Sequence, residues 1–151
     1  MYVLENKEIY NLEEELNWLD EKNIYKKLKK IGVHRGQPAI LAYIYMHRNC
    51  TQFEIARYLG LSRASVGVSV KRMVKNGYIT IEQSENDRRS TCLNITKTGI
   101  KILVDSDMVL DEYVSDKFDG FTEEELTMYL RMLKKIKRNL TRVYRESISN
   151  K

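Results

Sequence analysis

A mainly α-helical fold with one small β-hairpin is predicted by three features of this 151-residue sequence. The first is a pair of short helical segments separated by a glycine, within residues 51–77. The second is a pair of β-prone segments that follow directly and enclose a charged tip. The third is a set of long helical stretches with apolar stripes near both ends of the chain. The order helix, turn, helix, hairpin predicts a winged helix-turn-helix lobe, and the terminal helices predict a separate helical layer.

The first helix is expected over residues 6–30, where apolar side chains recur at helical spacing. Gly32 and Gly36 interrupt this pattern. A second helix is expected to begin near Pro38, because proline is favoured in a first helical turn, and to run to about Arg48.

The helix-turn-helix begins with a capping signal. Thr51 and Glu54 have the spacing of a capping box, in which each residue satisfies a free backbone N–H of the other. A short helix is expected from about Gln52 to Tyr58, followed by Gly60, which can adopt a left-handed conformation without a Cβ clash. Its apolar positions are Phe53, Ile55, Ala56 and Leu59.

The next helix is expected to start after Ser62, a favourable N-cap residue, and to end at Gly77. One of its faces is predicted to be buried because apolar side chains recur every three or four residues. These are Val66, Val70, Met73, Val74 and Tyr78. Polar and basic residues fall mostly on the other face.

The hairpin is predicted from residues 78–83 and 90–95, which are β-prone and alternate moderately in polarity. A long helix is expected to open at 96–99 and to run to about Phe118. Thr122 and Glu125 form a second capping box before the last helix. That helix carries an apolar seam close to a heptad repeat. We expect the terminal helices to pair across a two-fold axis, although packing within one subunit would also cover them.

Positive charge is concentrated in the middle of the chain. Residues 48–101 hold ten Lys/Arg and four Asp/Glu, whereas the whole chain has a net charge of +5. A basic field on one module is expected of a protein that binds a polyanion.

Other classes of protein are disfavoured. No nucleophile–base pair or phosphate-binding glycine loop appears, so an enzyme is not expected, and neither is a cofactor. The two cysteines, Cys50 and Cys92, lack metal-ligand spacing and are interpreted as reduced packing thiols, with a redox switch as the alternative. No apolar run is long enough for a membrane span, and the acidic start does not resemble a signal peptide. We therefore expect a cytoplasmic protein that does not contact a membrane.

The sequence resembles the MarR family of transcription regulators from about Tyr10 to about Tyr144. The resemblance rests on residues 61–66 (LSRASV), which lead to 75–79 (KNGYI). Asp87-Arg88-Arg89 follows as a wing motif, and Leu93, Thr96 and Gly99 resemble the family's opening of the dimerisation helix.

The resemblance implies an obligate homodimer that binds double-stranded DNA at a pseudo-palindromic operator. It also implies a repressor that a small anionic or phenolic ligand releases. The expected domains are an N-terminal dimerisation helix and loop (1–36), a winged helix-turn-helix lobe (37–98) and C-terminal dimerisation helices (99–151).

The predicted DNA contacts lie on the second helix of the helix-turn-helix and on the wing. Phosphates are expected to be neutralised by cations and bonded by serines, while Arg63, Ser65, Gly67 and Val68 face base edges. The resemblance places Arg89 in the minor groove, oriented by Asp87; an ordinary charged hairpin tip is the alternative. The full set is Ser62, Arg63, Ser65, Gly67, Val68, Ser69, Lys71, Arg72 and Lys75, with Asp87, Arg88 and Arg89.

Gly67 and Val68 depart from the polar or basic pair that the family often has there. Close approach of the backbone to DNA, with Val68 against a thymine methyl, is one interpretation. Sparse base contact is the other.

The predicted ligand crevice contains Tyr25, His34, Arg35, Tyr43 and His47. His34 and Arg35 could hold an anion; ordinary helix packing and a solvated loop are the alternative. Two other functions stay open at this point: a non-specific architectural DNA-binding protein and a winged-helix adaptor for other proteins.

Overall fold

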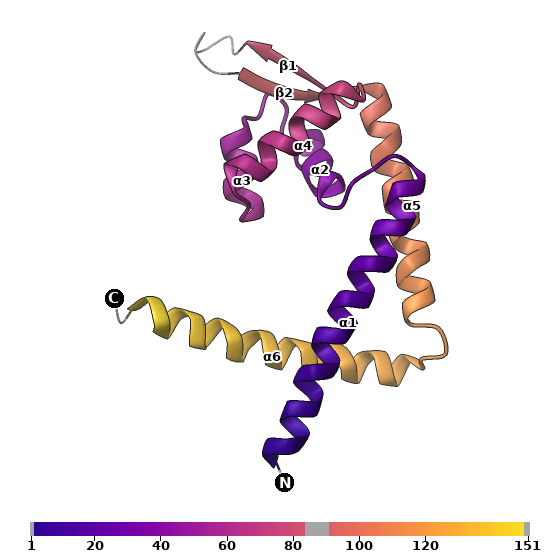
Figure 1. Cartoon of the computed structure of the whole chain (residues 1–151), viewed down its shortest axis with the longest axis vertical. Helices are drawn as coiled ribbons and strands as arrows, with labels where there is room; N and C mark the ends of the chain where they lie inside the picture. Colours follow the sequence, from indigo (N-terminus) through magenta and orange to yellow (C-terminus); the bar gives the residue numbers. More distant parts are fainter. Residues whose placement is uncertain (1, 84–90, 150–151) are drawn as a thin grey trace. The chain divides into compact units, whose positions relative to one another are not determined.

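The computed structural model describes residues 2–83 and 91–149, and contains six α-helices and one antiparallel hairpin within that part (Figure 1). The helices are α1 (Tyr2–Lys30), α2 (Gln37–Met46), α3 (Gln52–Leu59), α4 (Arg63–Lys75), α5 (Lys97–Lys117) and α6 (Glu123–Ser149). The strands are β1 (Ile79–Gln83) and β2 (Thr91–Ile95). The predicted fold class, mainly α with a small hairpin, is confirmed.

The chain forms two compact units, Met1–Tyr113 and Val114–Lys151. The first contains α1 to α4, the hairpin and most of α5. The second contains the end of α5 and α6. The domain boundaries predicted after residues 36 and 98 stay a prediction.

The core of the first unit lies where α2, α3, α4 and the hairpin meet. Its side chains come from apolar positions on every one of these elements, so these short helices are stabilised mainly by packing against one another. The most deeply buried are Ile40, Leu41, Ile44, Ile55, Val66, Val70, Met73, Ile79 and Leu93.

The hairpin is paired in register from Ile79 with Ile95 to Gln83 with Thr91. A further bridge joins Leu93 to Cys50, whose carbonyl oxygen accepts a hydrogen bond from the Leu93 N–H at 2.8 Å. This bridge ties the hairpin to the segment between α2 and α3.

The start of α5 packs closely against the base of the hairpin. The Thr96 hydroxyl donates to the Gly77 carbonyl oxygen at 2.6 Å and accepts from the Gly99 N–H at 3.0 Å. Gly99 is buried, and a Cβ added there would lie 2.0 Å from the Tyr78 carbonyl oxygen. Glycine is therefore the residue that permits this approach.

Helix α1 is joined to α5 near the end of the first unit. The Lys27 Nζ lies 2.9 Å from Glu112 Oε1, and the Tyr113 hydroxyl donates a hydrogen bond to the Asp20 carboxylate. Desolvation, with the bonded Asp20 carboxylate, raises the pKa of Tyr113 to about 12. The rest of α1 leaves large apolar side chains exposed within its unit, among them Ile9, Leu12, Leu16 and Trp18.

In the second unit, the predicted capping box of α6 is present. The Thr122 N–H donates to Glu125 Oε2 at 2.8 Å, and the Glu125 N–H donates to Thr122 Oγ1 at 3.2 Å. The predicted seam of α6 is exposed within this unit, at Leu130, Leu133, Ile136, Leu140 and Val143.

Two details of the prediction were wrong. Helix α1 begins at Tyr2 rather than near Asn6, because the residues before Asn6 continue the helix. Val74, assigned to the buried face of α4, is exposed, since α4 turns that position away from the core that Val70 and Met73 enter.

Candidate nucleic-acid interface

The turn between α3 and α4 is built by the local signals that the sequence predicts. The Thr51 Oγ1 accepts from the Glu54 N–H at 3.2 Å, and the Glu54 carboxylate accepts from the Thr51 N–H at 2.7 Å. The bond from the Thr51 N–H to the carboxylate, with a second one from the Thr51 hydroxyl, lowers the pKa of Glu54. Gly60 ends α3 with φ +64°, and Ser62 Oγ caps α4 by accepting from the Ser65 N–H at 3.1 Å. The turn therefore sets the direction of α4 by hydrogen bonds and not by packing alone.

Helix α4 separates a buried face from an exposed one. Val66, Val70 and Met73 enter the core. Gly67 and Ser69 are half-buried, and the other predicted contact residues on α4 and its cap are exposed: Ser62, Arg63, Ser65, Val68, Lys71, Arg72 and Lys75. The exposed face carries four cations and no carboxylate, so it presents positive potential along about 18 Å of helix.

The guanidinium of Arg63 packs over the ring of Phe53, which the sequence predicts as one of the apolar positions of α3. Its guanidinium carbon lies 4.6 Å from the centroid of the Phe53 ring. Phe53 is half exposed, so it forms a platform beside the first turn of α4 and not part of the core. The contact could not be predicted from the sequence, because Phe53 and Arg63 are ten positions apart and nothing in either segment indicates that their side chains meet.

Gly67 is not required by the packing of α4 on α3. A Cβ added there would lie 3.5 Å from Gln52 Oε1, which is an ordinary contact distance, and the residue has no left-handed φ.

We therefore expect Gly67→Ala to stabilise the protein by roughly 1 kcal/mol, the difference in helix propensity between the two residues. Denaturant unfolding of both proteins at the same concentration would measure this. A loss of stability would show that α4 has less room at this position than the contact distance indicates.

The wing residues Asp87, Arg88 and Arg89 lie outside the described residues. The paired strands end at Gln83 and Thr91, so the segment 84–90 connects their ends.

The five predicted crevice residues are not brought into one site. Tyr25 and Arg35 line a hollow of about 270 Å³ with Glu21 and Lys22, and Arg35 is already ion-paired with Glu21. The His34 backbone N–H donates to the buried Gln37 Oε1 at 2.9 Å, while the His34 side chain is exposed.

Tyr43 and His47 belong to a separate aromatic group. Their ring centroids are 4.3 Å apart, and the Tyr58 ring lies 4.8 Å from that of Tyr43. Desolvation, with the nearby Glu54 carboxylate, raises the pKa of Tyr43. Tyr58 is a member of this group that sequence reasoning missed.

Both cysteines are buried and carry free thiols. Burial, with the nearby Glu54 carboxylate, raises the pKa of Cys50 to about 11. Because the thiolate is the reactive form, this setting disfavours oxidation at neutral pH.

We expect alkylation of Cys50 in the folded protein to stay slow from pH 7 to 9 and to accelerate only as pH approaches 11. The same raised pKa stabilises the fold below the pKa of an unfolded thiol, and this contribution is lost as pH rises toward 11. Mass spectrometry after timed alkylation would show the rate. Modification near pH 7 as fast as in the denatured chain would contradict the prediction.

Among the described residues, no cluster of three His, Cys, Asp or Glu could hold a metal ion. In the same part of the chain, every helix is too short or too polar to cross a bilayer.

A capped helix-turn-helix followed by an antiparallel hairpin defines a winged helix-turn-helix protein. The MarR family's sequence pattern matches residues 31–90. Over 115 residues the chain is 28% identical to the HTH-type transcriptional regulator BilQ of Clostridioides difficile, covering 74% of this chain and 78% of that protein. The chain is therefore similar to the MarR family over its winged helix-turn-helix, and the proteins that it resembles are transcriptional regulators and not enzymes.

Solved structures of the family share the fold. A MarR-like transcription regulator from Bacillus cereus superposes with a TM-score of 0.78 at 22% identity, covering 91% of this chain and 99% of that one. The MepR protein of S. aureus, solved as a complex with DNA, superposes with a TM-score of 0.67 at 21% identity over 85% of this chain and 94% of that one.

Proposed function

We propose that this regulator binds double-stranded DNA as a homodimer at a pseudo-palindromic operator. The observation that carries the proposal is the exposed face of α4, where four cations and the capped N-terminus project from a rigid core. The N-terminus of a helix and Arg/Lys side chains are the groups that bind phosphates.

The individual roles follow from position along α4. Lys71, Arg72 and Lys75 lie toward its C-terminal end and would neutralise phosphates, with Ser62 and Ser69 as neutral donors. In the first turns, Arg63, Ser65, Gly67 and Val68 would face base edges, where Arg63 can bond a guanine in a bidentate manner. The stacking of Arg63 on Phe53 supports this role, since a restrained guanidinium loses less freedom on binding.

The segment 84–90 would act as the wing, with Arg89 in the minor groove, Asp87 orienting it and Arg88 near the phosphates. We expect Arg89→Ala to weaken operator binding by about tenfold or more, because narrow A·T-rich grooves attract arginine. A fluorescence anisotropy titration at physiological salt would measure the change. Unchanged affinity would remove the wing from the mechanism.

Homodimerisation is supported by apolar surface that each unit leaves uncovered. Large side chains on α1 and on α6 are each about 40–65% exposed, and such contiguous surface is typical of protein interfaces. Two copies of α4 related by a two-fold axis would then reach half-sites about 10 bp apart.

The direction of regulation and the ligand are also proposals. Repression would follow if the dimer occupies an operator that overlaps a promoter. A small anionic or phenolic effector is supported by the tyrosine beside a cation at Tyr25 with Arg35, and by the aromatic pair of Tyr43 with His47. Transcription from an operator-bearing template, with and without such compounds, would test both.

The first experiment is selection of bound sequences from a random duplex pool with the purified protein at physiological salt. Enrichment of a pseudo-palindrome with half-sites about one turn apart would support the proposed function. Salt-sensitive binding without enrichment would favour an architectural role, and no binding would favour an adaptor.

A further inference from the structure

The second half of α6 carries a concentration of positive charge that the winged helix does not use. Residues 131–145 contain seven Lys/Arg and no Asp/Glu, while the whole chain has a net charge of only +5. This segment is therefore more basic than any other of its length, although it lies far from α4 in the sequence.

Six of these cations fall on one side of α6. At 3.6 residues per turn, their spacing confines them to a stripe about 100° wide and about 21 Å long. We call this the α6 basic stripe; it consists of Arg131, Lys134, Lys135, Arg138, Arg142 and Arg145.

The stripe lies opposite the apolar seam of the same helix. Leu133, Ile136, Leu140 and Val143 are centred on the other side of α6, roughly 170° away. A subunit that covers the seam therefore leaves the stripe facing outward. Its cations are available to a partner other than a second copy of the chain.

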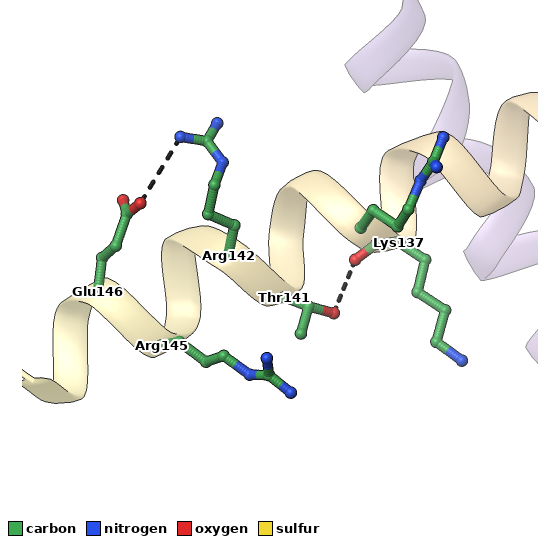
Figure 2. A pocket seen from close by; sticks show the side chains of 6 residues that line it. Lys137, Thr141, Arg142, Arg145 and Glu146 are labelled. Carbon is green, nitrogen blue, oxygen red and sulfur yellow. Dashed lines mark hydrogen bonds and ion pairs between the residues drawn. The ribbon is translucent and has the colours of Figure 1, made fainter.

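Little in its own unit neutralises the stripe. Among the described residues from 114 onward, the ion pair that involves it joins Arg142 to Glu146 at 3.6 Å, and both side chains are more than half exposed. Figure 2 shows Arg142 turned toward Glu146, while Arg145 and Lys137 extend away from the helix. These side chains line a hollow of about 400 Å³ with Arg138, Thr141 and Glu146.

We propose that the α6 basic stripe is a second binding surface for duplex DNA, which contacts the phosphate backbone without reading sequence. Four of its six cations are arginines, whose guanidinium groups match phosphate in a bidentate manner. No aromatic side chain lies within the stripe, so it has no platform on which unpaired bases could stack. A dimer would present two such stripes besides its two α4 helices, and could hold a second segment of DNA.

This proposal goes beyond the proposed operator binding, and its test is designed to be independent of it. The background is a full chain with Arg63→Ala and Lys71→Ala, which disables α4. Within it, the stripe variant carries Arg131→Gln, Lys134→Gln, Arg138→Gln and Arg142→Gln. The matched control carries Lys7→Gln, Lys26→Gln, Lys30→Gln and Lys101→Gln, which removes the same charge from exposed positions on α1 and α5.

Binding to a 30-bp duplex of random sequence is measured over a range of salt concentrations. We expect the stripe variant to bind at least tenfold more weakly than the control. The slope of log affinity against log salt should fall by about 3 to 4, since each lost phosphate contact removes about 0.9.

Several results would overturn the proposal. One is an equal effect of the two variants, which would show that only total charge matters. A second is dissociation of the stripe variant into monomers in sedimentation velocity, which would assign the stripe to the interface between subunits. A third is stronger stripe-dependent binding to vesicles of anionic phospholipid than to the duplex at equal salt. Failure of the wild type to select an operator would count against the proposed function alone.

Discussion

Replacing Gly99 with alanine should destabilise the protein by about 3 kcal/mol or more, the upper range for overpacking a tightly packed site. The new Cβ would lie 2.0 Å from the Tyr78 carbonyl oxygen and 2.7 Å from Ile95 Cγ1. The first of these atoms is backbone, so it cannot rotate away as the end of a side chain could. Relief would require α5 to move from the hairpin, which would break the hydrogen bonds that the Thr96 hydroxyl donates to the Gly77 and Tyr78 carbonyl oxygens.

Denaturant or thermal unfolding at a fixed protein concentration would measure this loss, since dimer stability depends on concentration. For a chain of this size the expected fall in Tm is roughly 10 °C. Gly67→Ala is the matched control, because it makes the same substitution in a helix that has room for the methyl group. Equal stability of the Gly99→Ala protein and the wild type would mean that α5 can move away from the hairpin without cost.

Replacing Arg63 with alanine should weaken operator binding by about 5- to 150-fold for each half-site and relax selection at one position in each of them. This range corresponds to roughly 1–3 kcal/mol for a bidentate contact to guanine. Arg63 lies in the first turn of α4, next to the Ser62 cap, where a recognition helix directs its side chains to base edges. Repeating the sequence selection with the variant would show which position loses its preference.

Two further variants separate the effect of the Arg63 guanidinium on DNA binding from the effect of the Phe53 ring beneath it. Phe53→Leu keeps the guanidinium but removes the ring beneath it, so we expect a smaller loss of affinity with the same base preference. Arg57→Ala removes an exposed cation from α3 and should change affinity little beyond its effect on charge. If Arg63→Ala lowers affinity uniformly without altering the selected sequence, Arg63 contacts phosphate and not a base.

The elements that were correctly predicted are those with local causes. The capping box of Thr51 and Glu54, the left-handed Gly60 and the cap at Ser62 each depend on residues within a few positions of one another. The hairpin strands were placed within a residue of their observed bounds for the same reason. Hydrogen bonds between near neighbours depend mainly on the local sequence, so they can be predicted without knowledge of the rest of the fold.

The two errors are the start of helix α1 and the burial of Val74. Val74 fits the spacing of the buried face, but it is exposed in the structure, whereas Val70 and Met73 are buried. The ligand crevice stays a prediction: its residues share a region of the sequence, and the structure places Tyr25 with Arg35 and Tyr43 with His47 in separate groups. The side chains that come into contact are decided by the angles between helices. These angles cannot be predicted from the spacing of apolar residues along one helix.

The sequence by itself determined the order of the helices, the turn of the helix-turn-helix, the hairpin and the basic character of α4, since propensity, capping and charge act locally. Only the tertiary structure decided that Gly99 contacts the hairpin, that Phe53 supports Arg63 and that Cys50 is buried with a raised pKa. Each of these properties depends on atoms brought together by packing of the core. The distances between such atoms are set by the whole fold and not by any one segment.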